Sequence, residues 1–161
     1  MHTGWDFIDI GMDANSLIDC VQDNGSLSSG HLRDEYGNDN LCVSSRAFGE
    51  VVKFLQEEKG LSEDEAMDRA HGLLDQHDVT LLDKEDVDDE EGQDLIEKYE
   101  DADFELHYPD STILAHYLRE SMDLLLSRDW GLRQAAEAEG LDAEKMPTPT
   151  ELADRKFESL F

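Results

Sequence analysis

Two carboxylates in this sequence stand where apolar runs give way to predicted helices. Asp13 lies in "IGMDANSLID", and Asp129 lies in "LLLSRDWGL". In open parallel sheets, binding sites form outside the carboxyl ends of the strands, so both side chains are candidates for one site. Asp is also a common helix cap, and capping alone would explain either residue. Because 41 of the 161 residues are Asp or Glu, an acid is a candidate site residue only if its position in the predicted fold is informative.

Two further acids have informative positions. Glu50 shares a helical face with Val51 and Phe54, so its carboxylate should point inward, where it needs a cation, hydrogen bonds or a metal. Asp110 opens a predicted helix after Pro109, either as its cap or as a site residue. Four converging carboxylates would repel one another without a divalent cation, and hard oxygen ligands suit Mg²⁺ or Mn²⁺.

Predicted strands alternate with predicted helices along the chain. Strands are expected within 5–12, 40–45, 79–83 and 122–127, and helices from 13 and within 46–60, 62–79, 110–121, 129–140 and 148–161. Residues 23–40 are predicted to be a loop or a short irregular helix. This alternation predicts an α/β fold with a mainly parallel sheet, and the length predicts one domain over 1–161. The acidic segment 83–103 is read as an insertion or helix, and 141–161 as a C-terminal helical tail.

The net charge of −28, with only 13 Lys and Arg, would oppose compaction at ordinary ionic strength. At molar salt the Debye length falls to about 3 Å, so the acidic excess favours a halophilic source. The alternative is an acidic protein that mimics nucleic acid or binds basic partners. The two cysteines form no CxxC pair, and no run approaches the ~18 apolar residues that span a bilayer. We therefore expect a cytoplasmic protein without a membrane partner.

Four segments together resemble the PIN domain, a family of metal-dependent ribonucleases that includes the VapC-type toxins. "MDANSLI" resembles the family's first strand and D-x-N/S motif, and "VSSRAFGEVVKFL" resembles its Glu-bearing helix. "YPDSTILAHYL" is similar to the family's Asp-bearing helix start, and "LLLSRDWGL" to its strand ending in T/S-x-D. Their order and spacing agree with the family. Asp9 is a rival for Asp13, but "DAN" fits the motif and "DIG" does not.

The resemblance implies a three-layer α/β/α fold and cleavage of RNA with Mg²⁺ or Mn²⁺. It implies that the catalytic and metal-binding residues are the four acids, supported by two polar side chains: Asp13, Glu50, Asp110 and Asp129, with Asn15 and Ser127. The implied partners are an RNA substrate, an antitoxin protein and a second copy of the chain.

The scarcity of cations keeps other functions open, because RNA binding normally draws on Lys and Arg. One alternative is a PIN-like protein without catalysis that binds a protein partner. Another is an RNA-processing nuclease outside toxin–antitoxin systems. The six His residues show no convincing ligand spacing, which disfavours a zinc enzyme.

Overall fold

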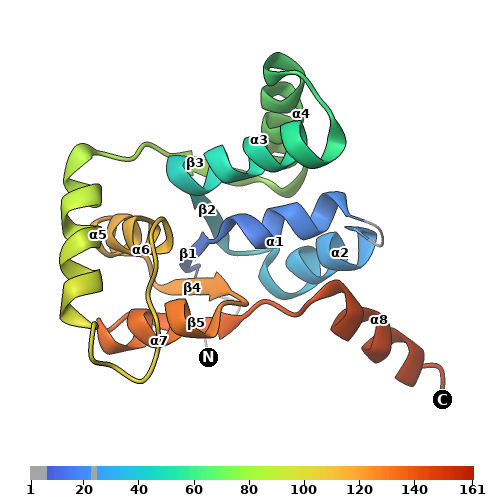
Figure 1. Cartoon of the computed structure of the whole chain (residues 1–161). Helices are drawn as coiled ribbons and strands as arrows, with labels where there is room; N and C mark the ends of the chain where they lie inside the picture. Colours follow the sequence, from blue (N-terminus) through green and yellow to red (C-terminus); the bar gives the residue numbers. More distant parts are fainter. Residues whose placement is uncertain (1–6, 23–24) are drawn as a thin grey trace.

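The computed structural model describes residues 7–22 and 25–161. Its centre is a sheet of five parallel strands in the order β3-β2-β1-β4-β5 (Figure 1). The strands are β1 (Asp9–Met12), β2 (Asn40–Ser44), β3 (Val79–Leu82), β4 (Leu124–Ser127) and β5 (Asp142–Lys145). The predicted α/β class with a mainly parallel sheet is confirmed.

Helices cover both faces of the sheet, as the predicted three-layer fold requires (Figure 1). The chain steps from β1 to β2 to β3 in one direction and then crosses back to β4 and β5. Right-handed connections therefore place the helices between β1 and β3 on one face and those between β3 and β5 on the other. The helices are α1 (Ala14–Ile18), η1 (Asp19–Val21), α2 (Gly25–Tyr36), α3 (Ser45–Lys59), α4 (Glu63–His77), α5 (Asp86–Lys98), α6 (Asp110–Arg119), α7 (Trp130–Ala138) and α8 (Pro149–Glu158).

The central strands position the candidate site. All four residues of β4 are buried, and Met12 at the end of β1 lies beside Leu126 of β4. The backbone N–H of Asp13 donates to the carbonyl oxygen of Leu126 at 3.3 Å. The strand order reverses between β1 and β4, and open sheets bind ligands at such a point. Asp13 and Asp129 therefore follow neighbouring strands at the edge where a site should form.

Close packing on Gly11 holds α6 against β1. A Cβ atom at Gly11 would lie 2.5 Å from the Tyr117 ring, so only glycine fits beneath this side chain. The Tyr117 hydroxyl donates to the carbonyl oxygen of Met12 and accepts from the backbone N–H of Ser44 at 2.9 Å. These contacts tie α6 to β1 and β2, which fixes where Asp110 at the start of α6 can lie.

Most predicted helix ends are confirmed by their caps. Ser44 accepts from the backbone N–H of Arg46 at the start of α3, and Gly60, with φ of 69°, ends this helix in the left-handed region. Thr148 caps α8, whose first residue is Pro149. These local signals are strong because each satisfies helix-end groups that would otherwise lack partners.

Two segments differ from the sequence-based expectations. The stretch 23–40, expected to be a loop or a short irregular helix, contains the regular 12-residue helix α2, and its first two positions lie outside the described residues. Burial of Leu32 and Tyr36 in α2 outweighs a composition rich in Gly and Ser. The predicted helical tail 141–161 is wrong at its start, because residues 142–145 form β5. This edge strand pairs with β4 but shows no apolar alternation, since three of its residues are exposed.

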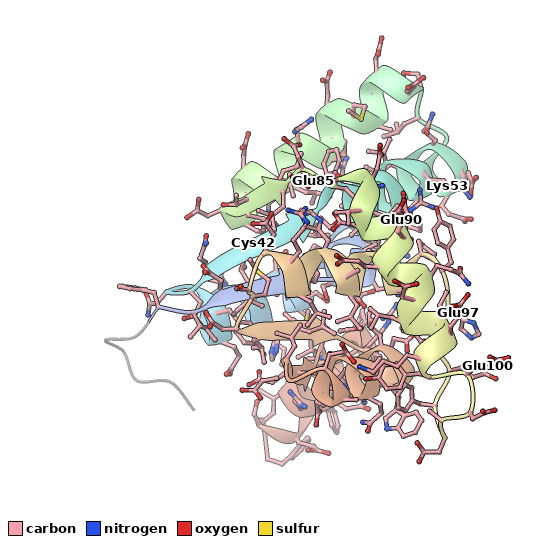
Figure 2. The ribbon with its side chains drawn as sticks, turned by 90° about the vertical axis from the view of Figure 1, so that its left-hand side faces the viewer. Cys42, Lys53, Glu85, Glu90, Glu97 and Glu100 are labelled. Atoms are coloured by element: carbon pink, nitrogen blue, oxygen red, sulfur yellow. The ribbon has the colours of Figure 1, made fainter. Side chains whose placement is uncertain are left out.

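The acidic segment 83–103 contains α5, which packs against α6. Figure 2 looks onto this helix, where Glu90 and Glu97 are exposed. The expected strand at 5–12 begins at Asp9 in the structure, and its first two positions lie outside the described residues. In the part of the chain that the structure describes, every helix is too short or too polar to cross a membrane.

Candidate active site

Asp13 is buried at the end of β1, with an exposed fraction of 4%. Its Oδ1 atom accepts from the backbone N–H of Ser16 at 3.1 Å and from the Ser16 hydroxyl at 2.9 Å, which caps α1. Its Oδ2 atom accepts from the Ser127 hydroxyl at 2.5 Å. Burial raises the pKa of Asp13, while the bonds from Ser127 and Ser16 act against that rise. The carboxylate is thus held in one orientation.

Ser127 connects Asp13 to Asp129. Its hydroxyl donates to Asp13 and accepts from the backbone N–H of Asp129 at 3.0 Å. Asp129 is exposed and caps α7, where its Oδ1 atom accepts from the backbone N–H of Leu132 at 2.9 Å. Capping is therefore confirmed for both Asp13 and Asp129. It does not exclude a second role, because the two acids share a serine at the ends of adjacent strands.

Asp110 does not cap α6, so that interpretation is wrong. The cap position is Pro109, and no side-chain bond caps this helix. Burial, together with repulsion from Asp129, Asp13 and Glu50, raises the pKa of Asp110 to about 7. The four predicted acids therefore lie close enough for Asp110 to feel the charge of the other three.

Glu50 lies half-buried on α3. Burial raises its pKa, and the charge of Asp13 raises it further, while Arg46 and Lys53 act in the opposite direction. Helices from both faces of the sheet thus contribute an acid to the same edge, since Glu50 comes from α3 and Asp110 from α6.

The donor chemistry of these acids fits a hard divalent cation, which would relieve their mutual repulsion. In the described residues, however, no three His, Cys, Asp or Glu side chains are gathered closely enough to hold a metal ion. The four carboxylates are electrostatic neighbours, and they are not arranged as a ready ligand shell.

Ser16, rather than Asn15, makes the side-chain bonds to Asp13 in this structure. Asn15 is exposed on α1, whereas Ser16 is buried and bonds Asp13 through two atoms. Ser16 was not among the predicted site residues. It stands three positions after Asp13, the spacing at which an N-cap side chain bonds to the helix, and this spacing was the available signal.

Nearby cations are engaged with other groups. The Arg128 Nη1 atom lies 2.9 Å from Oδ2 of Asp19, which is itself buried. Arg133 donates to the backbone carbonyl oxygen of Ser127 at 3.0 Å. These arginines stabilise the end of β4 and the start of α7. They offset only part of the negative charge of the site.

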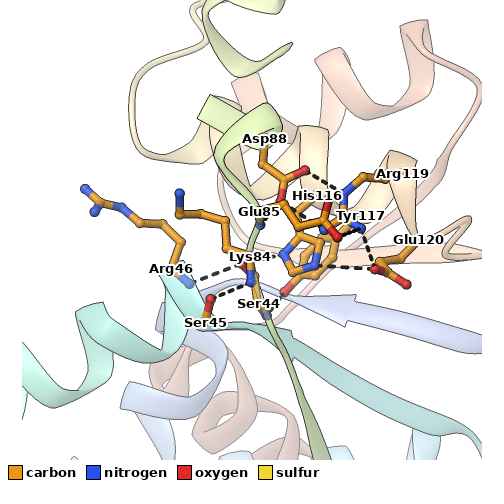
Figure 3. Close-up of polar contacts among 10 residues, drawn as sticks. All are labelled: Ser44, Ser45, Arg46, Lys84, Glu85, Asp88, His116, Tyr117, Arg119 and Glu120. Atoms are coloured by element: carbon orange, nitrogen blue, oxygen red, sulfur yellow. Dashed lines mark hydrogen bonds and ion pairs between the residues drawn. The ribbon is translucent and has the colours of Figure 1, made fainter. Parts of the chain in front are cut away.

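A second charged region lies toward the other end of α6 (Figure 3). The Asp88 carboxylate is fully buried and accepts from Arg119 at 2.8 Å and 3.0 Å. Buried His116 lies beside it, with its Nδ1 atom 3.0 Å from the Ser44 hydroxyl. Burial acts to raise the pKa of Asp88, but the Arg119 bonds and a backbone bond outweigh it and leave this pKa lowered.

The chain belongs to the PIN domain family, because the family model of the PIN domain matches residues 12–138. A comparison with curated protein sequences finds no match.

Solved structures of toxin–antitoxin proteins have a similar fold. VapBC2 from Rickettsia felis, bound to a DNA fragment from its promoter, matches with a TM-score of 0.66 and 13% identity, over 87% of this chain and all of that chain. VapBC-1 from nontypeable Haemophilus influenzae matches with a TM-score of 0.64 and 14% identity, over 86% and 98% of the two chains. VapC20 of Mycobacterium tuberculosis, a toxin that cleaves the sarcin–ricin loop, matches with a TM-score of 0.50 and 15% identity, over 72% and 86%. At these identities the likeness shows the fold alone.

Proposed function

We propose that residues 1–161 form a single PIN-like domain that is a metal-dependent endoribonuclease. The observation that carries the proposal is the repulsion of Asp110 by Asp13, Glu50 and Asp129 at one edge of a PIN-family sheet. Without a bound cation, such repulsion lowers the stability of the folded protein. Sites where carboxylates perturb one another in this way are often functional.

Asp13, Glu50, Asp110 and Asp129 would hold Mg²⁺ or Mn²⁺. The bound ion would activate a water molecule and neutralise charge at the phosphate. Ser127 fixes the direction of Asp13 and the backbone of Asp129, so it keeps two ligands in register. The acids act as ligands rather than as proton shuttles.

We further propose a cytoplasmic toxin that acts on RNA and is paired with an antitoxin protein. The VapBC neighbours, which are solved as toxin–antitoxin complexes, support this role. Asn15, exposed two residues after Asp13, stays our candidate for a polar support that orients ligands or water. An RNA-processing nuclease without an antitoxin would use the same site, and the neighbouring gene distinguishes the two.

Cleavage of single-stranded RNA tests the enzyme directly. Wild-type protein in concentrated KCl should cleave RNA with Mn²⁺ or Mg²⁺ and stop with EDTA. Asp13→Asn and Asp129→Asn should each lose at least about 100-fold in rate while staying folded, because Asn caps about as well as Asp but removes a charged ligand. Asp154→Asn on α8, an exposed acid outside the site, is the matched control and should retain full activity.

Two results would count against the enzyme. Full activity in Asp13→Asn would show that Asp13 is not part of the active site. Absence of cleavage and of metal binding in wild type would favour a partner-binding protein without catalysis.

A further inference from the structure

Two exposed aromatic side chains adjoin the candidate acids. Trp130 directly follows Asp129 and has an exposed fraction of 51%, and Tyr108 stands two residues before Asp110 with 57%. Single exposed apolar residues are common on proteins. These two are notable because each is next to a proposed metal ligand in the sequence and carries a flat ring that water can reach.

Trp130 lines a groove of about 700 Å³ beside Asp129. The opposite wall comes from the loop that contains Phe104 and His107. This loop is pressed against the start of α7, since a Cβ atom at Gly131 would lie 2.1 Å from the carbonyl oxygen of Glu105. The groove has the volume of small-molecule sites, and this close backbone contact allows only glycine at position 131.

Tyr108 carries a cation on its ring. The guanidinium carbon of Arg46 lies 4.7 Å from the ring centroid, within the range of a cation–π contact. In the part of the chain that the structure describes, the buried Nε atom of Arg46 has no hydrogen-bond partner. Arg46 begins α3, the helix that carries Glu50, so this planar pair stands on the α3 side of the acids.

Electrostatics alone would bind RNA poorly here. The chain has a net charge of −28, and Arg128 and Arg133 near the site are bonded to Asp19 and the Ser127 carbonyl. Nucleic-acid affinity normally comes from cations that displace counterions, and that contribution fades at high salt. Stacking of bases on aromatic rings requires no cations and accepts any base.

We infer that Trp130 and Tyr108 are stacking platforms for unpaired bases next to the phosphate at the carboxylates. Arg46, held on the Tyr108 ring, adds a planar donor for the RNA backbone or a base. This inference rests on the proposed function and extends it to a substrate-binding surface. It requires single-stranded substrate, because a base in a duplex has no free face.

Tryptophan fluorescence gives a direct test. The chain has two Trp residues, so in a Trp5→Phe background the emission reports Trp130 alone. A single-stranded oligouridylate is titrated in about 1 M KCl with EDTA, which prevents metal-dependent cleavage and screens charge. We expect quenching of Trp130 and a Kd that is nearly constant as salt is raised further.

Variants then separate stacking from other effects, with binding followed by the fluorescence anisotropy of a dye-labelled oligouridylate, because the Trp130 variants lose the Trp130 emission. Trp130→Ala and Tyr108→Ala should each weaken binding by roughly 5- to 150-fold, while Trp130→Phe should retain most of the affinity. Phe157→Ala on α8, an exposed aromatic with an exposed fraction of 62%, is the matched control and should bind as wild type. Melting curves verify that each variant is folded.

The outcomes distinguish this inference from the proposed function. Quenching and variant losses without cleavage in any metal would sustain the stacking surface and overturn the enzyme. Metal-dependent cleavage with unchanged binding in Trp130→Ala and Tyr108→Ala would sustain the enzyme and overturn the stacking surface.

Discussion

Acids in opposite electrostatic states lie near the two ends of α6. At its start, burial and three neighbouring carboxylates together raise the pKa of Asp110 to about 7. Toward its other end, Asp88 is more deeply buried, but the Arg119 bonds leave its pKa lowered (Figure 3). The two acids therefore differ in the direction of their pKa shift because Asp88 has a bonded cation and Asp110 has none among the described residues, and not because of their burial.

This difference indicates which acids are structural in a chain that has 41 of them. A buried carboxylate with a bidentate arginine is already neutralised and stabilises the packing of α5 on α6. Asp13, Glu50, Asp110 and Asp129 range from buried to exposed, and Asp110 is repelled by the other three without a bonded cation of its own in the described part of the chain. They therefore mark the place where an external cation would bind most favourably.

The largest expected effect comes from removing the structural cation. Arg119→Met should lower the free energy of unfolding by roughly 3–5 kcal/mol, because it leaves Asp88 charged and buried without its partner. Urea unfolding at fixed KCl measures this. Asp88→Asn in the same background should recover part of the loss, and an Arg119→Met variant as stable as wild type would contradict a structural role for the pair.

At the start of α6, replacement of Asp110 is expected to raise the free energy of unfolding by a smaller amount. The folded-state pKa of Asp110, about 7, lies above its ordinary value of 3.8, so its contribution to stability is complete at low pH and is lost as the pH rises through about 7. Without metal, Asp110→Asn should therefore stabilise the protein by roughly 2 kcal/mol at about pH 8, and hardly at all at about pH 4.

Asp88→Asn is the matched comparison for Asp110→Asn. Its lowered pKa stabilises the protein above the ordinary pKa of Asp, and this stability is lost as the pH falls through the folded-state pKa. Replacement should thus destabilise the protein at about pH 8. Equal effects of the two substitutions would remove the contrast between the regions.

The smallest effect is expected for acids outside both regions. Glu97 is exposed on α5 (Figure 2), and Glu97→Lys should raise the melting temperature slightly in dilute buffer and not in about 2 M KCl, where charges are screened. Wild type itself should melt at higher temperature as KCl increases, as a halophilic source implies. Greatest stability in dilute buffer would contradict that source.

Local signals in the sequence account for the elements that could be predicted. The buried run 124–127 and the capped start of α3 placed Asp129 and Glu50 on the correct elements. β5 gave no such signal, because a polar edge strand is defined by its pairing with β4 rather than by its own pattern.

Tertiary contacts account for what was missed at the sites. Asp88 and Arg119 are 31 residues apart and meet only because α5 packs on α6. The contacts of Tyr117 with β1 and β2 place α6 so that Asp110 lies near other acids, whereas Asp88 of α5 lies beside a cation of α6. A sequence can locate acids along elements, but it does not show which of them find a partner.

Binding of Mn²⁺ tests the central claim most directly. Calorimetric titration and melting curves in concentrated KCl should show Mn²⁺ binding that stabilises wild type and the control Asp154→Asn, since a ligand that binds only the folded state raises its stability. The apparent affinity should fall at least about tenfold in Asp110→Asn, which removes one charged ligand. Identical Mn²⁺ binding in all three proteins, or no binding in any of them, would contradict a metal centre at these carboxylates.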